Sequence, residues 1–229
     1  MLRALINLFR SDDPLGAMGR DFARMFRLTY DMSVTAGRIY FSEDTNAEAR
    51  SDLYRVDIDV NRLERKIRKH LVAHLALPGN ERDVPHGLAL MSLVKDVERI
   101  GDYTKNLAEV GDLHPGPLKD DEILQELREI RTGVESAFSD SLAMFELSHD
   151  RAQQLILQGR NLTGRCEALL NRIARSDHDS GTVTALVLGS RYYKRIAGHV
   201  LNVLSATVMP LHKLDYYDED AIPQTTTRS

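Results

Sequence analysis

A helical spacing of apolar residues between positions 90 and 107 is the feature that most constrains how this chain folds. The residues that recur there at steps of three and four are Leu90, Leu93, Val97, Ile100, Thr104 and Leu107. Residues at this spacing lie along one side of an α-helix, so the segment predicts a helix that packs this side against a core.

The same spacing recurs along the chain and predicts an all-α protein with six long helices. They are expected over about residues 14–40, 45–77, 83–110, 119–147, 151–175 and 182–209. Pro78 and Gly79 stop the second helix, and Pro210 interferes with continuation of the last. Asp83 is expected to cap the third helix. The clearest internal break is the stretch 111–117, which holds two glycines and two prolines.

The composition limits the classes of protein to which the chain can belong. Of its 229 residues, 42% are hydrophobic and 6% aromatic, and Trp is absent, which suits a helical core of aliphatic side chains. The formal net charge of −4 argues against a general nucleic-acid binder. No apolar run reaches the ~18–20 residues that span a bilayer. The N-terminus does not read as a signal peptide, so we expect a soluble, cytoplasmic protein.

The sequence offers no motif for catalysis. Cys166 is the only cysteine, and its apolar helical neighbours predict a buried small hydrophobe rather than a nucleophile. There is no Ser/His/Asp nucleophile elbow and no Gly-rich loop that would bind phosphate directly. His70 and His74 are four apart and could ligate a metal, but a partly buried helical pair is the preferred explanation. We expect a protein that is not an enzyme.

Two carboxylates stand four residues apart in the third helix, Glu98 and Asp102. Like charges at this spacing cost about 0.2–0.5 kcal/mol in an isolated helix. The spacing alone leaves two interpretations open. The pair is either a functional site, or it belongs to a solvated face that Lys95, Arg99 and Lys105 neutralise.

The two halves of the chain resemble each other, which predicts a duplication. In the third and sixth helices, Ile100 and Asn106 match Ile196 and Asn202 at an offset of 96. In the second and fifth helices the offset is 102, and one shorter loop explains the difference. The acidic residues survive in the first half only. The replacements are Glu98 by Lys194, Asp102 by Gly198, Asp57 by Gly159 and Glu64 by Cys166.

The run Val97-Glu98-Arg99-Ile100-Gly101-Asp102, followed by Asn106, resembles the signature of the PhoU-type phosphate-uptake regulators. Asp57, Val60 and Glu64 resemble the second-helix element of that family, and Met18-Gly19 fits weakly. The resemblance covers about residues 14–209, and it is specific in the first half and degenerate in the second. It implies two tandem three-helix bundles, over 14–113 and 118–210, which we expect to pack end to end. Residues 1–13 are then an amphipathic extension, and 215–229 a tail expected to be disordered.

The resemblance also implies a function, which is regulation of inorganic phosphate transport and phosphate-starvation signalling. The implied partners are a membrane phosphate transporter, a phosphate-sensing histidine kinase, or both. A homodimer, no nucleic acid, and at most peripheral association with the inner face of the membrane are further expectations. The implied metal ligands are Glu98, Asp102, Asp57 and Glu64. Such all-oxygen ligands suit Mg, Mn or Fe(III), and Zn is a further candidate. Because Lys194 and Gly198 replace the pair, no second site is expected.

Other interpretations remain at this point. A metal storage or buffering protein is the main alternative, and a bare helical scaffold is another. Ferritin-like chemistry would need Glu-x-x-His motifs beside the carboxylates, which are absent. A basic cluster on the second helix is either a solvated face or a contact for anionic lipid or an acidic partner. Its members are Arg62, Arg65, Lys66, Arg68 and Lys69.

Overall fold

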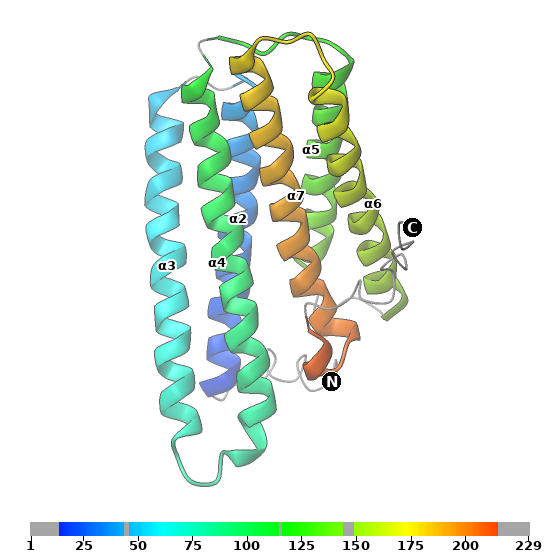
Figure 1. Cartoon of the computed structure of the whole chain (residues 1–229). Helices are drawn as coiled ribbons and strands as arrows, with labels where there is room; N and C mark the ends of the chain where they lie inside the picture. Colours follow the sequence, from blue (N-terminus) through cyan, green and yellow to red (C-terminus); the bar gives the residue numbers. More distant parts are fainter. Residues whose placement is uncertain (1–13, 44–45, 115, 144–148, 215–229) are drawn as a thin grey trace, which may run out of the picture.

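The described residues form six long α-helices that run roughly parallel or antiparallel to one another (Figure 1). The computed structural model describes residues 14–43, 46–114, 116–143 and 149–214, and no strand occurs in these ranges. The helices are α2 (Pro14–Tyr40), α3 (Ala47–Leu75), α4 (Val84–Leu113), α5 (Glu122–Ser141), α6 (His149–Ile173) and α7 (Ser180–Val208). Short 3-10 turns cover Glu81–Asp83 and Leu211–Lys213. The predicted extension 1–13 and tail 215–229 lie outside the described residues.

Side-chain caps fix where three of the helices begin. Asn46 accepts from the backbone N–H of Glu48 at the start of α3, at 3.0 Å. Asp121 accepts from two backbone N–H groups of α5, and Asp179 does the same for α7. Each carboxylate or amide oxygen thereby satisfies donors that have no partner within the helix. The cap at Asp121 places the start of α5 at Glu122, later than the expected start near 119.

Two details of the predicted helix ends were wrong. The fourth helix was expected to reach residue 147, but α5 ends at Ser141, where the N–H of Leu142 bonds back to the carbonyl of Ser139. Asp83 does occupy the N-cap position of α4, but its side chain makes no capping hydrogen bond. Its carboxylate lies 2.9 Å from Nε2 of His74 instead, which ties the start of α4 to the end of α3.

The helices pack as two groups of three that lie side by side. Helices α2, α3 and α4 contact one another and form the first bundle, and α5, α6 and α7 form the second. The bundles meet chiefly through α4 and α7, which lie next to each other in Figure 1. The expectation of end-to-end packing was therefore wrong. Lateral packing buries a second apolar side of α4 and α7 along their length, which contact between helix ends cannot do.

One hydrophobic core runs through both bundles. It includes Phe22 and Ile67 of the first bundle, Phe138 and Ile173 of the second, and Val97 and Val203 from the two helices that join them. A hydrogen bond also connects the two bundles at one end. The Tyr40 hydroxyl donates to the carbonyl oxygen of Ala185 at 2.9 Å. Because the core is continuous, the faces of α3, α4, α6 and α7 keep fixed positions relative to each other.

Candidate functional site

The carboxylates predicted from the sequence lie on adjoining faces of α3 and α4. Asp57 and Glu64 come from α3 and are both 8% exposed. Glu98 and Asp102 come from α4, with side chains 13% and 31% exposed. We call these four side chains the carboxylate face. Its members are held against the first bundle rather than extended into solvent.

Gly101 lies at the centre of this face, where α3 packs against α4. A Cβ built on Gly101 would lie 3.8 Å from Oδ1 of Asp57 and 3.7 Å from Cγ1 of Val60. These are ordinary contact distances, so the Asp57 carboxylate lies close to Gly101 of α4. This contact explains why Asp57 is buried although it is charged.

Lys105 brings Asp57 and Asp102 together. Its Nζ lies 3.1 Å from Oδ2 of Asp57 and 3.8 Å from Oδ1 of Asp102. Burial lowers the pKa of the Lys105 ammonium, but the hydrogen bond and charge of Asp57, with the charges of Asp102 and Glu109, outweigh burial and raise the pKa overall. Asp57 and Asp102 thus share one surface, joined by a cation.

The remaining carboxylates, Glu98 and Glu64, also have cationic partners, and Asp102 has a second one. Glu98 Oε2 lies 2.5 Å from Nζ of Lys95, and Asp102 lies 3.4 Å from Nη1 of Arg99. Glu64 Oε1 lies 3.0 Å from Nη2 of Arg68, at an angle that makes no hydrogen bond. Each of the four carboxylates therefore has a basic side chain within 3.4 Å. The face is close to neutral, which is the arrangement expected of the second interpretation of Glu98 and Asp102.

The carboxylate face fits a metal ion in donor type but not in arrangement. Its oxygens are those that hard cations prefer. However, the described residues contain no group of three or more Asp, Glu, His or Cys side chains gathered closely enough to hold an ion. An ion would have to displace Lys105 from between Asp57 and Asp102. Metal binding by Glu98, Asp102, Asp57 and Glu64 remains a prediction.

Sequence reasoning missed a buried polar cluster between the bundles. Asp96 of α4 is 6% exposed and accepts from Nδ1 of His199 at 2.7 Å and from Nδ2 of Asn202 at 2.8 Å. The His199 ring also stacks on Tyr103, with ring centroids 5.6 Å apart. Of these residues, only Asn202 was noted from the sequence, as the match to Asn106. The position of Asp96 on an inner side of α4 was the one available signal.

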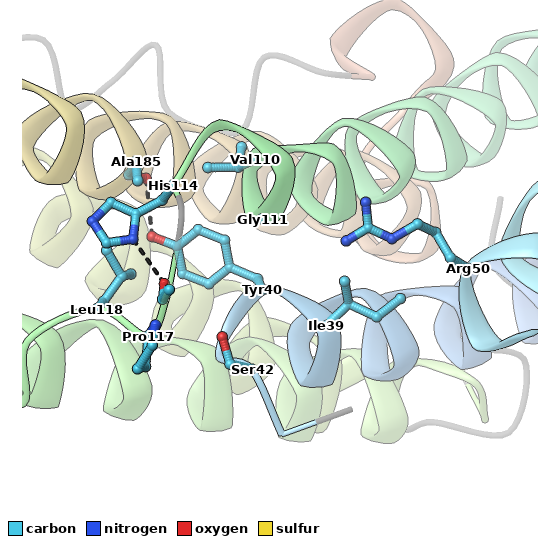
Figure 2. A pocket seen from close by; sticks show the side chains of 11 residues that line it. Ile39, Tyr40, Ser42, Arg50, Val110, Gly111, His114, Pro117, Leu118 and Ala185 are labelled. Carbon is cyan, nitrogen blue, oxygen red and sulfur yellow. Dashed lines mark hydrogen bonds between the residues drawn. The ribbon is translucent and has the colours of Figure 1, made fainter. Parts of the chain in front are cut away.

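A cavity of about 310 Å³ lies where α2 and α4 end and α7 begins. Figure 2 shows Tyr40 and His114 beside it, with Arg50 reaching in from α3. The His114 ring bonds the hydroxyl of Thr182 at 3.1 Å, and burial raises the pKa of the Tyr40 hydroxyl. These contacts connect the two bundles, so we assign the cavity to their junction.

Other sequence predictions can be placed directly. Cys166 is fully buried, which confirms the predicted burial, and this burial raises the pKa of its thiol to about 11. In the basic cluster of α3, Arg62, Lys66 and Arg68 pair with carboxylates, whereas Arg65 and Lys69 have no described partner. Among the described residues, no helix combines the length and apolar character needed to cross a membrane.

Comparisons with known proteins find a matching family model and solved structures of similar fold. The family model described as PhoU domain matches residues 22–111, which span most of the first bundle. No curated protein sequence matches the chain. The fold is similar to the crystal structure of PhoU from Pseudomonas aeruginosa, with a TM-score of 0.73 and 19% identity over 88% of this chain and 96% of that one.

A second solved structure has the same fold. It is the phosphate transport system regulatory protein PhoU from Streptococcus pneumoniae, with a TM-score of 0.72 and 19% identity. The match covers 87% of this chain and 94% of that one. The all-helical architecture of this chain is therefore that of PhoU structures, and the sequence match lies in its first half.

Proposed function

We propose that this chain, in which residues 22–111 form a PhoU domain within a PhoU-like fold, regulates inorganic phosphate transport by protein–protein contact. The observation that carries the proposal is the domain match, because it covers the helices that hold the carboxylate face. The similar structure from Streptococcus pneumoniae is that of a phosphate transport system regulatory protein. The two proteins share a fold, and we propose that they also share the regulatory role.

The proposed partner is a membrane phosphate transporter or a phosphate-sensing histidine kinase. The regulator would bind one conformational state of this partner more tightly than the other, and so shift the population between them. Such a mechanism needs no catalytic group in the chain. We propose that the protein acts from the cytoplasmic side and reaches the membrane only through its partner.

The α3–α4 hairpin is the contact surface that we assign to this function. Besides the carboxylate face, it carries an apolar end, here called the hairpin tip and defined as residues 72–88. Four of its large apolar side chains are 38–61% exposed, namely Val72, Leu77, Val84 and Leu88. The tip extends beyond the other helices in Figure 1. Exposed apolar groups gathered in this way are typical of protein contact sites.

Deletion of the gene in its own organism tests the proposed function. Cells that lack the chain should express phosphate-starvation genes even when phosphate is abundant, and a plasmid copy of the gene should restore repression. A reporter for one such gene provides the measurement. Repression that is unchanged by the deletion would overturn the proposal. Co-purification from crosslinked membranes of phosphate-replete cells should identify the transporter or kinase.

A further inference from the structure

A groove of about 610 Å³ lies on the second bundle between α6 and α7. We call it the basic groove. Its cationic side chains are Arg160 from α6 and Arg191, Lys194 and Arg195 from α7. Among the described residues that line it, the one carboxylate is Glu167, which is hydrogen-bonded to Lys194. The lining therefore carries four permanent positive charges against one negative charge.

Two arginines of the groove, Arg191 and Arg195, have no ion-pair partner in the described part of the chain. Both are exposed, and they lie one helical turn apart. Like charges at this spacing repel each other. The chain as a whole has a net charge of −4, so a concentration of cations here is a local property of this surface. An anionic ligand would relieve the repulsion.

Two glycines keep the groove open. Gly164 of α6 and Gly198 of α7 both line it, and a Cβ built on either would meet no atom within 4 Å. The α7 wall runs from Arg191 to Asn202, which is about 16 Å at 1.5 Å per residue. This length exceeds that of a single phosphate ion, and the volume is in the range of small-molecule sites.

One end of the groove is held rigidly. His199 and Asn202 line that end, and buried Asp96 of the other bundle fixes both of them. Since Nδ1 of His199 is bonded to Asp96, only Nε2 remains for a ligand. Groups fixed before binding lose little conformational freedom on binding, which favours affinity.

The groove corresponds in position to the carboxylate face of the first bundle. Under the two offsets, Lys194 stands for Glu98 and Gly198 for Asp102. The contacts between helices follow the same offsets. Asp57 accepts a hydrogen bond from Lys105 in the first bundle, and in the second bundle the corresponding Gly159 packs against Leu201, which corresponds to Lys105. The surface that carries carboxylates in one bundle thus carries cations and a glycine in the other.

We propose that the basic groove binds an elongated anion with two or more phosphoryl groups, of the oligophosphate or nucleotide class. Guanidinium groups form paired, charge-assisted hydrogen bonds with phosphoryl oxygens, and Arg160, Arg191 and Arg195 supply three of them. This site does not depend on the proposed function, because it lies on the bundle that the PhoU domain match does not cover.

Calorimetric titration of the full chain with tripolyphosphate, ATP and orthophosphate tests the proposal. Tripolyphosphate should bind one per chain, and orthophosphate at least 10-fold more weakly, because it can reach only part of the groove. Tighter binding of ATP than of tripolyphosphate would show that the base also makes contacts. Equal affinities would assign the binding to the phosphoryl groups alone.

Gly198→Asp is the decisive variant, with Gly198→Ala as its matched control. Both side chains enter open space, and both residues favour a helix more than glycine does, so both variants should fold. Gly198→Asp places a carboxylate beside the arginines and should weaken tripolyphosphate binding at least 10-fold, whereas Gly198→Ala should bind like the parent chain. Circular dichroism and thermal melting would verify that both are folded.

A second comparison separates this site from general attraction of anions. Arg191→Gln with Arg195→Gln should weaken binding at least 10-fold. Arg65→Gln with Lys69→Gln removes the same charge from α3 and should change affinity less than 2-fold. The proposal is overturned if tripolyphosphate does not bind, or if the two double variants weaken binding equally. It is also overturned if Arg191→Gln with Arg195→Gln weakens binding to vesicles of anionic lipid but leaves tripolyphosphate binding unchanged.

Discussion

The ammonium of Lys105 lies 3.1 Å from Oδ2 of Asp57, and so joins α4 to a carboxylate of α3 that is almost completely buried. Asp57 also lies 3.4 Å from Nδ2 of Asn61, but no second cation contacts it in the described structure. The stability of the first bundle should therefore depend on Lys105 more than a lysine at the surface would suggest.

Lys105→Met should lower the free energy of unfolding by about 1–3 kcal/mol, since it leaves the buried carboxylate of Asp57 without its partner. Urea denaturation would measure this change. Asp57→Asn in the Lys105→Met background removes the unpaired charge and should recover part of the loss. Additive effects of the two substitutions would contradict a direct interaction between them.

Metal binding, if the carboxylate face has it, should increase when Lys105 is removed. Lys105→Gln frees oxygens of Asp57 and Asp102, and Glu98→Gln with Asp102→Asn removes two ligands with little change of shape. Elemental analysis after incubation with Mn or Fe should find more metal in the first variant and none in the second. Asp120→Asn with Glu122→Gln, at exposed positions of the α5 start, is the control.

The stoichiometry of that experiment also separates the two functions considered from the sequence. A regulator would hold about one ion or a few per chain, whereas a storage protein would hold many. Equal metal content in the parent and in the Glu98→Gln, Asp102→Asn variant would exclude the predicted ligands.

Substitutions in the carboxylate face and in the core should have different effects on repression and on the amount of soluble protein. Glu98→Gln with Asp102→Asn should leave soluble protein that represses phosphate-starvation genes less well. Ile100→Ala, at a fully buried site between the two carboxylates in sequence, should instead lower stability by about 2–5 kcal/mol and reduce the amount of soluble protein. Immunoblots beside the reporter assay distinguish the two. Normal repression by the charge-neutral variant would place the contact elsewhere on the hairpin.

The hairpin tip gives a separate prediction for partner binding. Leu77→Asp with Leu88→Asp should abolish co-purification of the membrane partner and leave the melting temperature nearly unchanged, because both side chains are more than half exposed. Leu157→Asp, at an equally exposed apolar position on α6, is the matched control and should retain the partner. Loss of the partner in the control as well would argue against a specific role of the tip.

Cys166 should resist thiol reagents while the protein is folded. At pH 8 a thiol with a pKa of about 11 is thiolate in about one molecule per thousand, against about one in ten for an ordinary cysteine. Burial also denies the reagent access. Labelling with Ellman's reagent should be at least about 100-fold faster in 8 M urea than in buffer. Rapid labelling of the folded chain would show that the α6–α7 interior opens readily.

The sequence by itself determined the local structure of this protein. Apolar spacing placed six helices, and Leu90, Val97 and Ile100 were correctly assigned to a core. The break at 78–80 separates α3 from α4, whereas α4 continues past Gly111 to Leu113. The motif around Glu98 and Asp102 led to the PhoU domain that the family comparison found. These features depend on residues within a few turns of each other, so their pattern can be recognised from the sequence alone.

Only the tertiary structure decided how the bundles meet and what their faces carry. Side-by-side packing depends on the contact between α4 and α7, which the sequence of either helix alone does not show. The pairing of Lys105 with Asp57, and of Asp96 with His199, joins residues 48 and 103 positions apart. Likewise, Arg160 and Arg195 line one groove only because α6 packs beside α7. Charge along a sequence can be counted, but whether it is neutralised or left exposed depends on which helices become neighbours.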